Sequence, residues 1–245
     1  MTISDRPDDQ RSGGVALWRQ IADAIRLDIV GGKLNAGDRL EGELALAGRF
    51  AVNRHTVRRA LAALAEEGVV RAEHGRGTFV DQARRLSYPI GRRTRLSENL
   101  AGQARDIRGQ LLSSRIERAT VRLARDLGVN PGTRLVRLET LSLADGRPLA
   151  RGTGWLPERR FPDFAAAFAE AGSTTLALQR FGVEDYSRAT TRISARHANA
   201  EESGALKLAP GAVLLVSDAV DIDADGVPIH AMLTRFPADR MELVV

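Results

Sequence analysis

The stretch that decides the fold of the first third of this chain is Leu17–Val80, LWRQIADAIRLDIVGGKLNAGDRLEGELALAGRFAVNRHTVRRALAALAEEGVVRAEHGRGTFV. Apolar residues recur every three to four positions in three successive segments, which predicts three amphipathic helices. The first segment ends at Gly31-Gly32, because paired glycines favour the end of a helix. Its apolar positions are Leu17, Ile21, Ile25 and Ile29.

The second and third segments are separated by the short connection Ala51-Val52-Asn53, and the Asn53 side chain can cap the third helix. The apolar positions of the second are Leu44, Ala47 and Phe50, and those of the third, which begins at Arg54, are Val57, Ala60, Leu61 and Leu64. Two short strands follow, Val69–Ala72 and Thr78–Val80, around a glycine-rich tip. Three helices followed by such a hairpin predict a winged helix-turn-helix, a fold that binds DNA.

The residues that we expect to contact DNA lie mainly at the start of the third helix and in the wing. A recognition helix reads base edges with its N-terminal residues, and an arginine there can pair with guanine through two hydrogen bonds. The alternative is a small helical domain whose arginines only face solvent. The predicted DNA contacts are Arg39, Arg49, Asn53, Arg54, His55, Thr56, Arg58, His74, Gly75, Arg76 and Gly77.

The composition restricts the remaining possibilities. The chain has 245 residues, a net charge of +5, no cysteine and four histidines, so we expect no disulfide, no metal site and no cofactor. No apolar run approaches the roughly 20 residues that span a bilayer. Residues 1–13 are polar and acidic, which predicts a disordered tail without a signal peptide and a cytoplasmic protein.

The rest of the chain changes to a mixed pattern of strands and helices. The turns at Asp145-Gly146 and Asp225-Gly226 predict β-hairpins, and therefore an α+β domain with an antiparallel sheet. We expect a winged helix-turn-helix domain at 14–82, a linker at 83–87 and the sheet domain at 88–245. The strands are predicted at 111–119, 135–143, 149–155, 186–195, 213–222, 227–236 and 241–245, and the helices at 120–127, 161–171, 174–181 and 200–208.

One segment of the second domain predicts an anion site. No acidic residue occurs between Asp81 and Glu98, and this interval is rich in arginine. Ser97 precedes a helical run that it can cap, and a capped helix N-terminus binds phosphate-like groups. Thr94 can add a hydroxyl group, and Arg93 or Arg95 a positive charge. The alternatives are contact with DNA phosphates, a solvated linker and an ordinary capped helix.

The first domain resembles the DNA-binding domain of GntR-type bacterial regulators. The resemblance rests on Gly37-Asp38-Arg39-Leu40, Val52-Asn53-Arg54-His55-Thr56-Val57-Arg58 and Gly75-Arg76-Gly77-Thr78-Phe79-Val80. The family usually has Leu-Pro-Ser-Glu where this chain has Leu40-Glu41-Gly42-Glu43. Many members also place a DNA-contacting arginine at the position of Leu44, so no DNA contact is assigned to that residue.

The second domain resembles UTRA, the effector-binding domain of the HutC branch of these regulators, which shares its fold with chorismate lyase. The likeness is greatest to regulators of phosphonate metabolism, through Arg92–Leu100, Leu138–Leu141, Trp155-Leu156-Pro157 and Thr234-Arg235-Phe236. It implies that Thr94, Arg95 and Ser97 contact the acidic head of an effector. Sugar-phosphate sensors of the branch tend to carry arginines where Thr140 and Ser142 stand. The predicted effector contacts are Arg93, Thr94, Arg95, Ser97, Thr140, Ser142, His230 and Phe236.

These observations predict a homodimeric transcription factor that binds operator DNA and a small anionic effector such as a phosphate, phosphonate or sugar phosphate, without a membrane. A HutC-branch regulator of sugar-phosphate or amino-acid catabolism genes is the alternative. An enzyme is disfavoured, and we assign no catalytic residue. A fused pyridoxal-phosphate aminotransferase would need a lysine, yet only Lys207 follows the first domain. An architectural DNA-binding protein would not explain the large second domain.

Overall fold

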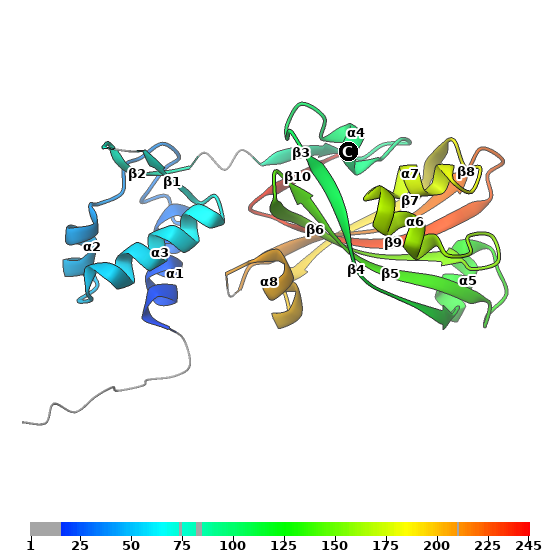
Figure 1. The fold of residues 1–245 in the computed structure, drawn as a ribbon, viewed down its shortest axis with the longest axis horizontal. Helices are drawn as coiled ribbons and strands as arrows, with labels where there is room; N and C mark the ends of the chain where they lie inside the picture. The colour runs from blue at the N-terminus through cyan, green and yellow to red at the C-terminus, as the bar shows by residue number, and fades with distance from the viewer. Residues whose placement is uncertain (1–15, 74, 82–84, 210) are drawn as a thin grey trace, which may run out of the picture. The chain divides into compact units, whose positions relative to one another are not determined.

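The computed structural model describes residues 16–73, 75–81, 85–209 and 211–245. The chain divides into two compact units, Met1–Ala83 and Arg84–Val245 (Figure 1). The tail predicted at 1–13 lies outside the described residues, as do residues 83 and 84 of the predicted linker. The last two linker residues, Leu86 and Ser87, belong instead to a strand, β3 (Leu86–Pro89).

The N-terminal unit has three helices followed by a hairpin, as predicted. The elements are α1 (Leu17–Val30), α2 (Glu43–Arg49), α3 (Arg54–Glu66), β1 (Val70–Glu73) and β2 (Gly77–Val80). All four apolar residues predicted for the inner face of α3 are buried. On α2, however, Leu44 is 73% exposed and Leu46 is buried in its place. The predicted inner face of this helix is therefore wrong at Leu44, because the short helix turns Leu46 and Ala47 toward α1 and α3.

The C-terminal unit is built on a six-stranded, fully antiparallel sheet with the order β4-β5-β6-β9-β8-β7. This confirms the predicted α+β fold. The strands are β4 (Ile107–Arg118), β5 (Arg134–Ala144), β6 (Arg147–Pro157), β7 (Tyr186–His197), β8 (Val213–Asp223) and β9 (Pro228–Pro237). The turn between β5 and β6 has the geometry that its sequence predicts, because Asp145 and Gly146 both have positive φ, at 50° and 78°.

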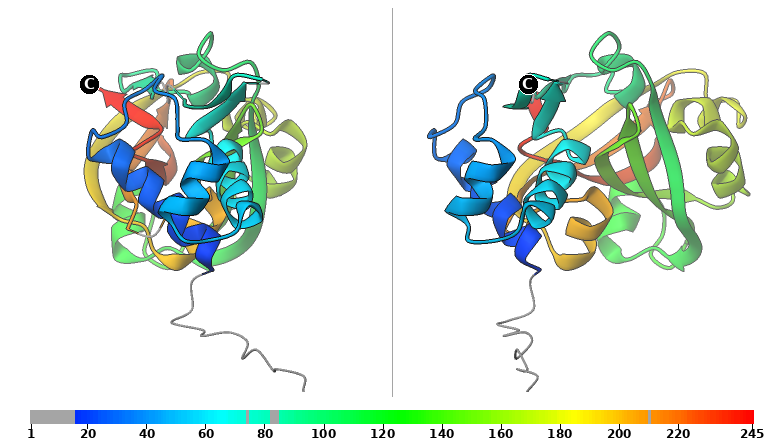
Figure 2. Two further views of the ribbon diagram at one scale, coloured as in Figure 1. Left: turned by 90° about the vertical axis from the view of Figure 1, so that its left-hand side faces the viewer. Right: turned by 60° about the vertical axis from the view of Figure 1, so that its left-hand side comes forward.

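Helices cover both faces of this sheet. Helices α6 (Phe164–Ala171) and α7 (Thr174–Gln179) pack on one face through an aromatic and aliphatic core that includes Phe161 and Leu156. Helices α5 (Val121–Leu127) and α8 (Ala200–Leu206) pack against the other face. Figures 1 and 2 show α6 and α7 side by side at one end of the unit, with α8 at the other. None of the described helices is long and apolar enough to cross a membrane.

A second sheet, of two strands, lies near the face of the large sheet that α6 and α7 cover. The last strand, β10 (Met241–Val244), pairs in parallel with β3 and does not extend the large sheet. The short helix α4 (Leu96–Asn99) follows β3, and Leu100 just after it is fully buried with Tyr88 and Phe236. This small sheet therefore places the residues around Arg95 beside the face that α6 and α7 also cover.

Candidate functional site

The start of α3 has the local geometry expected of a recognition helix. The Asn53 side-chain oxygen accepts a hydrogen bond from the Thr56 backbone N–H at 2.8 Å and another from the Thr56 hydroxyl at 3.0 Å. This confirms Asn53 as the helix cap. Arg54 and His55 follow at exposed positions of the first turn, where they are available to a partner.

A carboxylate that the sequence interpretation did not single out holds the arginines of α3. Glu43 of α2 accepts hydrogen bonds from Arg58 Nε at 3.1 Å and Arg58 Nη2 at 2.8 Å, and it lies 3.5 Å from Arg54 Nη2. The Arg58 guanidinium holds the pKa of the Glu43 carboxyl below its ordinary value. Glu43 therefore orients both side chains across the gap between the two helices, although 58% of the Arg58 side chain stays exposed.

The other predicted DNA contacts differ in how free they are. Arg49 pairs with Asp28 of α1 and with Glu41, so part of its role is to join α1 to α2. Arg39 lies against the wing, where a methyl group at Gly77 would come within 2.9 Å of its Nε. Gly77 and Gly75 both have positive φ, which suits a tight wing.

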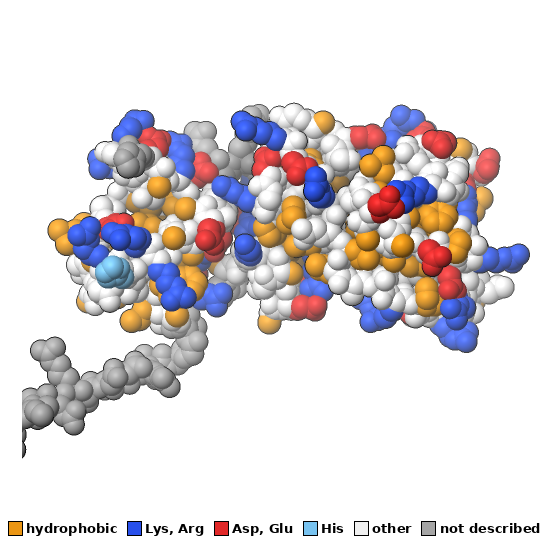
Figure 3. Space-filling view, viewed as in Figure 1, with side chains coloured by type: hydrophobic (Ala, Val, Ile, Leu, Met, Phe, Trp, Pro, Cys, Tyr) orange, Lys and Arg blue, Asp and Glu red, His pale blue; other side chains and the backbone are white. Residues whose placement is uncertain are grey.

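At the wing tip, Arg76 pairs with Glu73 at 2.6 Å and keeps 74% of its side chain exposed. His74 lies outside the described residues. Basic side chains and a histidine gather on one face of the unit formed by α1–α3 and the wing (Figure 3). These residues lie on an exposed surface of the unit, where a duplex could meet them.

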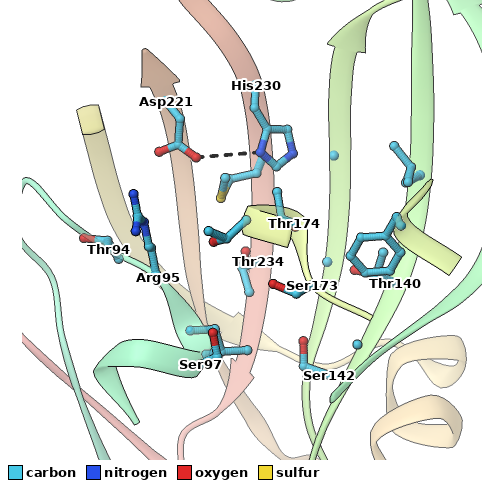
Figure 4. A pocket seen from close by; sticks show the side chains of 18 of the residues that line it. Thr94, Arg95, Ser97, Thr140, Ser142, Ser173, Thr174, Asp221, His230 and Thr234 are labelled. Carbon is cyan, nitrogen blue, oxygen red and sulfur yellow. Dashed lines mark ion pairs between the residues drawn. The ribbon is translucent and has the colours of Figure 1, made fainter. Parts of the chain in front are cut away.

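The C-terminal unit contains a cavity of about 160 Å³ between the α6–α7 face of the sheet and the residues that follow β3. Its floor is formed by alternate residues of β5, β6 and β9, because side chains two apart on a strand share a face. Its walls come from α6, α7 and the segment around Arg95. Figure 4 shows hydroxyl groups from both sides pointing into this space, among them those of Thr174 and Thr234.

The cavity brings together seven of the eight residues predicted to contact an effector. Arg93 is the exception: it lies outside the lining and pairs with Asp185. The predicted contacts that line the cavity are Thr94, Arg95, Ser97, Thr140, Ser142, His230 and Phe236. Their convergence comes from the fold, because they lie on three separate segments of the chain.

The predicted helix cap at Ser97 is wrong. Helix α4 begins at Leu96, its capping position is Arg95 in an extended conformation, and no side chain accepts a hydrogen bond there. Ser97 lies inside the helix because the turn closed by Thr94 and Gly91 starts the helix earlier than the sequence pattern indicated. The Thr94 hydroxyl donates to the Gly91 carbonyl at 2.6 Å and accepts from the Gly91 N–H at 3.0 Å. That hydroxyl is thus already used within its own turn.

The charge of Arg95 is also engaged within the unit. Arg95 Nη1 donates to Glu98 at 2.8 Å, and Nη2 donates to Asp185 at 2.5 Å. Its guanidinium carbon lies 4.7 Å from the ring centroid of Tyr186, and 9% of its side chain is exposed. Two carboxylates therefore balance this arginine, which leaves it less free to bind an anion than its sequence context indicated.

Several cavity residues were not identified from the sequence. Gly152 and Gly154 of β6 leave room over the floor, because a methyl group at either would lie 2.5 Å from Thr140 Oγ1 or His230 Nε2, respectively. The alternation of these glycines was visible in the sequence and could have indicated a close approach at this strand. Arg188 and Asp221, which form a buried ion pair at 2.7 Å, carry no such signal because they are 33 residues apart.

Comparisons with known proteins match both units. The model for bacterial regulatory proteins of the gntR family matches residues 17–80, and the UTRA domain model matches residues 102–242. An uncharacterized HTH-type transcriptional regulator from Rhizobium meliloti is 50% identical over 234 residues, which cover 96% of each chain. The probable transcriptional regulator PhnF of Escherichia coli is 32% identical over 217 residues, covering 85% of this chain and 86% of that one.

A solved structure resembles the whole chain. The crystal structure of PhnF from Mycobacterium smegmatis superposes with a TM-score of 0.62 at 26% identity. The match covers 90% of this chain and 96% of that chain. The match therefore includes parts of both units of this chain.

Proposed function

Because this chain belongs to the gntR family of bacterial regulatory proteins and carries a UTRA domain, we propose that it is a repressor controlled by a small anionic effector of phosphonate or other organophosphorus metabolism. It is a transcriptional regulator. The single observation that carries the proposal is the cavity of the C-terminal unit, which is lined by seven of the residues predicted for effector contact. The name PhnF, shared by two of its relatives, belongs to those proteins and supports only the choice of compounds to test.

The N-terminal unit supplies the DNA-binding half of the proposal. Arg54 and His55 are exposed at the capped start of α3, and Arg58 is oriented on the same helix by Glu43. We assign direct base contact to Arg54, and phosphate contacts to Arg58 and to Arg76 in the wing. A lone winged helix contacts few base pairs, so the active form is a homodimer on a two-fold operator.

The C-terminal unit supplies the control. An effector that binds more tightly to one state of the dimer changes the affinity for DNA by that difference in binding free energy. The hydroxyl groups of the lining suit a small oxyanion because they can donate to it, and Arg188, which also lines the cavity, can add charge-assisted hydrogen bonds. The proposed outcome is release of the operator when the effector binds.

The proposal is tested by combining a ligand panel with a DNA-binding assay. The full chain is mixed with a duplex that covers the promoter of its own gene, and methylphosphonate, inorganic phosphate, glucose 6-phosphate and glucose are added in turn. We expect an anionic phosphorus compound to raise the melting temperature by mass action and to release the duplex. Glucose, which lacks the anion, is the control. A response to glucose alone, or to no compound in the panel, would contradict the proposed effector class.

A further inference from the structure

At one end of the cavity β7, β8 and β9 lie side by side, and there the sequence indicated His230 but neither Arg188 nor Asp221. Arg188 of β7 donates from Nε to Asp221 Oδ1 of β8 at 2.7 Å. Asp221 Oδ2 faces His230 Nδ1 of β9 at 3.7 Å (Figure 4). All three side chains are more than nine-tenths buried, with exposed fractions of 7%, 1% and 8%. Asp221 therefore holds Arg188 by a hydrogen bond and lies within ion-pair distance of the His230 ring.

The donors that this arrangement presents to the cavity are largely unused. The two terminal nitrogens of Arg188 have only long contacts, at 3.4 Å to Thr191 Oγ1, 3.4 Å to the Thr94 carbonyl and 3.6 Å to Met232 Sδ. A guanidinium has five N–H groups, and only Nε has a short bond here. Its capacity for a charge-assisted hydrogen bond is thus higher than that of Arg95, whose terminal nitrogens both reach carboxylates at 2.8 Å or less.

The second ring nitrogen of His230, Nε2, faces strand β6. Nε2 makes no hydrogen bond with the described residues, and it lies over Gly154, where a methyl group would come within 2.5 Å. Tyr88 also lines the cavity, and its hydroxyl has no partner among the described residues. Burial raises the pKa of Tyr88 above its ordinary value, whereas the nearby Arg188 charge lowers it. The phenol therefore stays protonated at neutral pH and can donate.

We propose that Arg188, His230 and Tyr88 form the acid-group subsite of this cavity, that Asp221 is its positioning residue, and that the subsite takes a phosphonate or phosphate monoester in preference to a carboxylate. This inference rests on the proposed function, because it assigns the anion to one end of the same cavity. It places the acidic head at the β7–β8–β9 end, whereas the sequence indicated the start of α4.

The preference for a phosphate or phosphonate over a carboxylate follows from which groups carry a proton at neutral pH. Where a neutral His230 carries its proton on Nδ1, the nitrogen 3.7 Å from the Asp221 carboxylate, its Nε2 accepts; a protonated ring donates from Nε2. A phosphate monoester has its second pKa near about 6 and holds an O–H in part of its population at neutral pH. It can donate that O–H to neutral Nε2 or accept from the protonated ring. A carboxylate, ionised above about pH 4, can bind only the protonated ring.

The test measures binding of two small probes to the full chain. Dissociation constants for methylphosphonate and acetate are obtained by ³¹P and ¹H NMR titration, which detect millimolar binding. We expect methylphosphonate to bind at least about tenfold more tightly than acetate. Since a hydrogen bond to a charged group is lost, Arg188→Gln and His230→Phe should each weaken methylphosphonate binding by roughly tenfold to a hundredfold.

Two further variants separate recognition from stability. Arg192→Gln removes an exposed arginine from the same strand outside the lining and is the matched control, with binding within about twofold of wild type. Gly154→Ala places a methyl group against Nε2, leaves the ion pair intact and should also weaken binding. If Arg188→Gln melts much lower than wild type, Arg188→Gln/Asp221→Asn replaces it, because that pair leaves no unpaired charge.

The possible results distinguish this subsite from the proposed function. Suppose that wild type binds methylphosphonate no more tightly than Arg188→Gln, His230→Phe and Gly154→Ala do. In that case the anion lies elsewhere in the cavity, and the proposed effector class survives. If acetate binds as tightly as methylphosphonate, the preference is refuted. If wild type does not bind methylphosphonate, the subsite and the effector class both fail.

Discussion

Glu202 should make the C-terminal unit sensitive to acid. This side chain, 4% exposed, lies in the first turn of α8 and accepts hydrogen bonds from Arg196 Nη1 at 2.7 Å and Nη2 at 2.6 Å. It also accepts from the Asn199 backbone N–H at 3.1 Å, and Asn199 in turn caps α8. Arg235 Nε lies 3.3 Å away. These donors, the Arg196 hydrogen bonds above all, lower the pKa of Glu202 from 4.5 to about 2.

The size and sign of the effect follow from proton linkage. Because the pKa is lowered by folding, the contribution is present above the unfolded value of 4.5 and is lost as the pH falls toward the folded value of about 2. A shift of this size corresponds to about 3 kcal/mol of unfolding free energy at pH 7, since one pKa unit is worth about 1.4 kcal/mol. About 2 kcal/mol of it should disappear between pH 7 and pH 3.

The assay compares wild type with Glu202→Gln, which keeps the side-chain volume and removes the charge. Urea unfolding is followed by fluorescence in a Trp18→Phe background, so that Trp155 alone reports on the C-terminal unit. The stability difference between the two proteins should shrink by about 2 kcal/mol from pH 7 to pH 3. Glu201→Gln is the control, because the neighbouring Glu201 side chain is 75% exposed. A difference that stays constant across this range would refute the reasoning.

Four further predictions concern the N-terminal unit and the assembly. Arg54→Ala should reduce discrimination between operator and random DNA by about 1–3 kcal/mol in a gel shift while leaving the melting temperature unchanged; unchanged discrimination would remove Arg54 from base recognition. Arg58→Ala should instead weaken binding to all duplexes alike and lower the salt slope by about one, so a change in sequence preference alone would contradict its phosphate role. Asn53→Ala should destabilise the unit by about 1 kcal/mol, because the α3 cap is lost. Thermal unfolding measures this change, and an unaltered melting temperature would contradict it. The full chain should sediment as a dimer at micromolar concentration. A monomer would contradict the proposal that a homodimer binds a two-fold operator.

The sequence determined those features that local chemistry controls. The apolar spacing of α3 predicted its buried face because a helix brings every third or fourth residue to the same side, and all four residues are buried. Asn53 predicted the cap of α3, and Asp145-Gly146 predicted a turn, because each depends on the residue's own hydrogen bonding or backbone freedom. Resemblance to known motifs also predicted the family and seven residues that line the cavity, because those positions lie in recognisable segments.

Only the tertiary structure decided which charges are free. Sequence context made Arg95 and Ser97 the centre of the anion site, yet Asp185, 90 residues away from Arg95 along the chain, pairs with that arginine, and the turn before α4 moves Ser97 inside the helix. In the same way, Arg188, Asp221 and His230 come into line only when β7, β8 and β9 pair in register. A side chain's availability depends on partners that long-range strand pairing brings to it, and no local pattern contains that information.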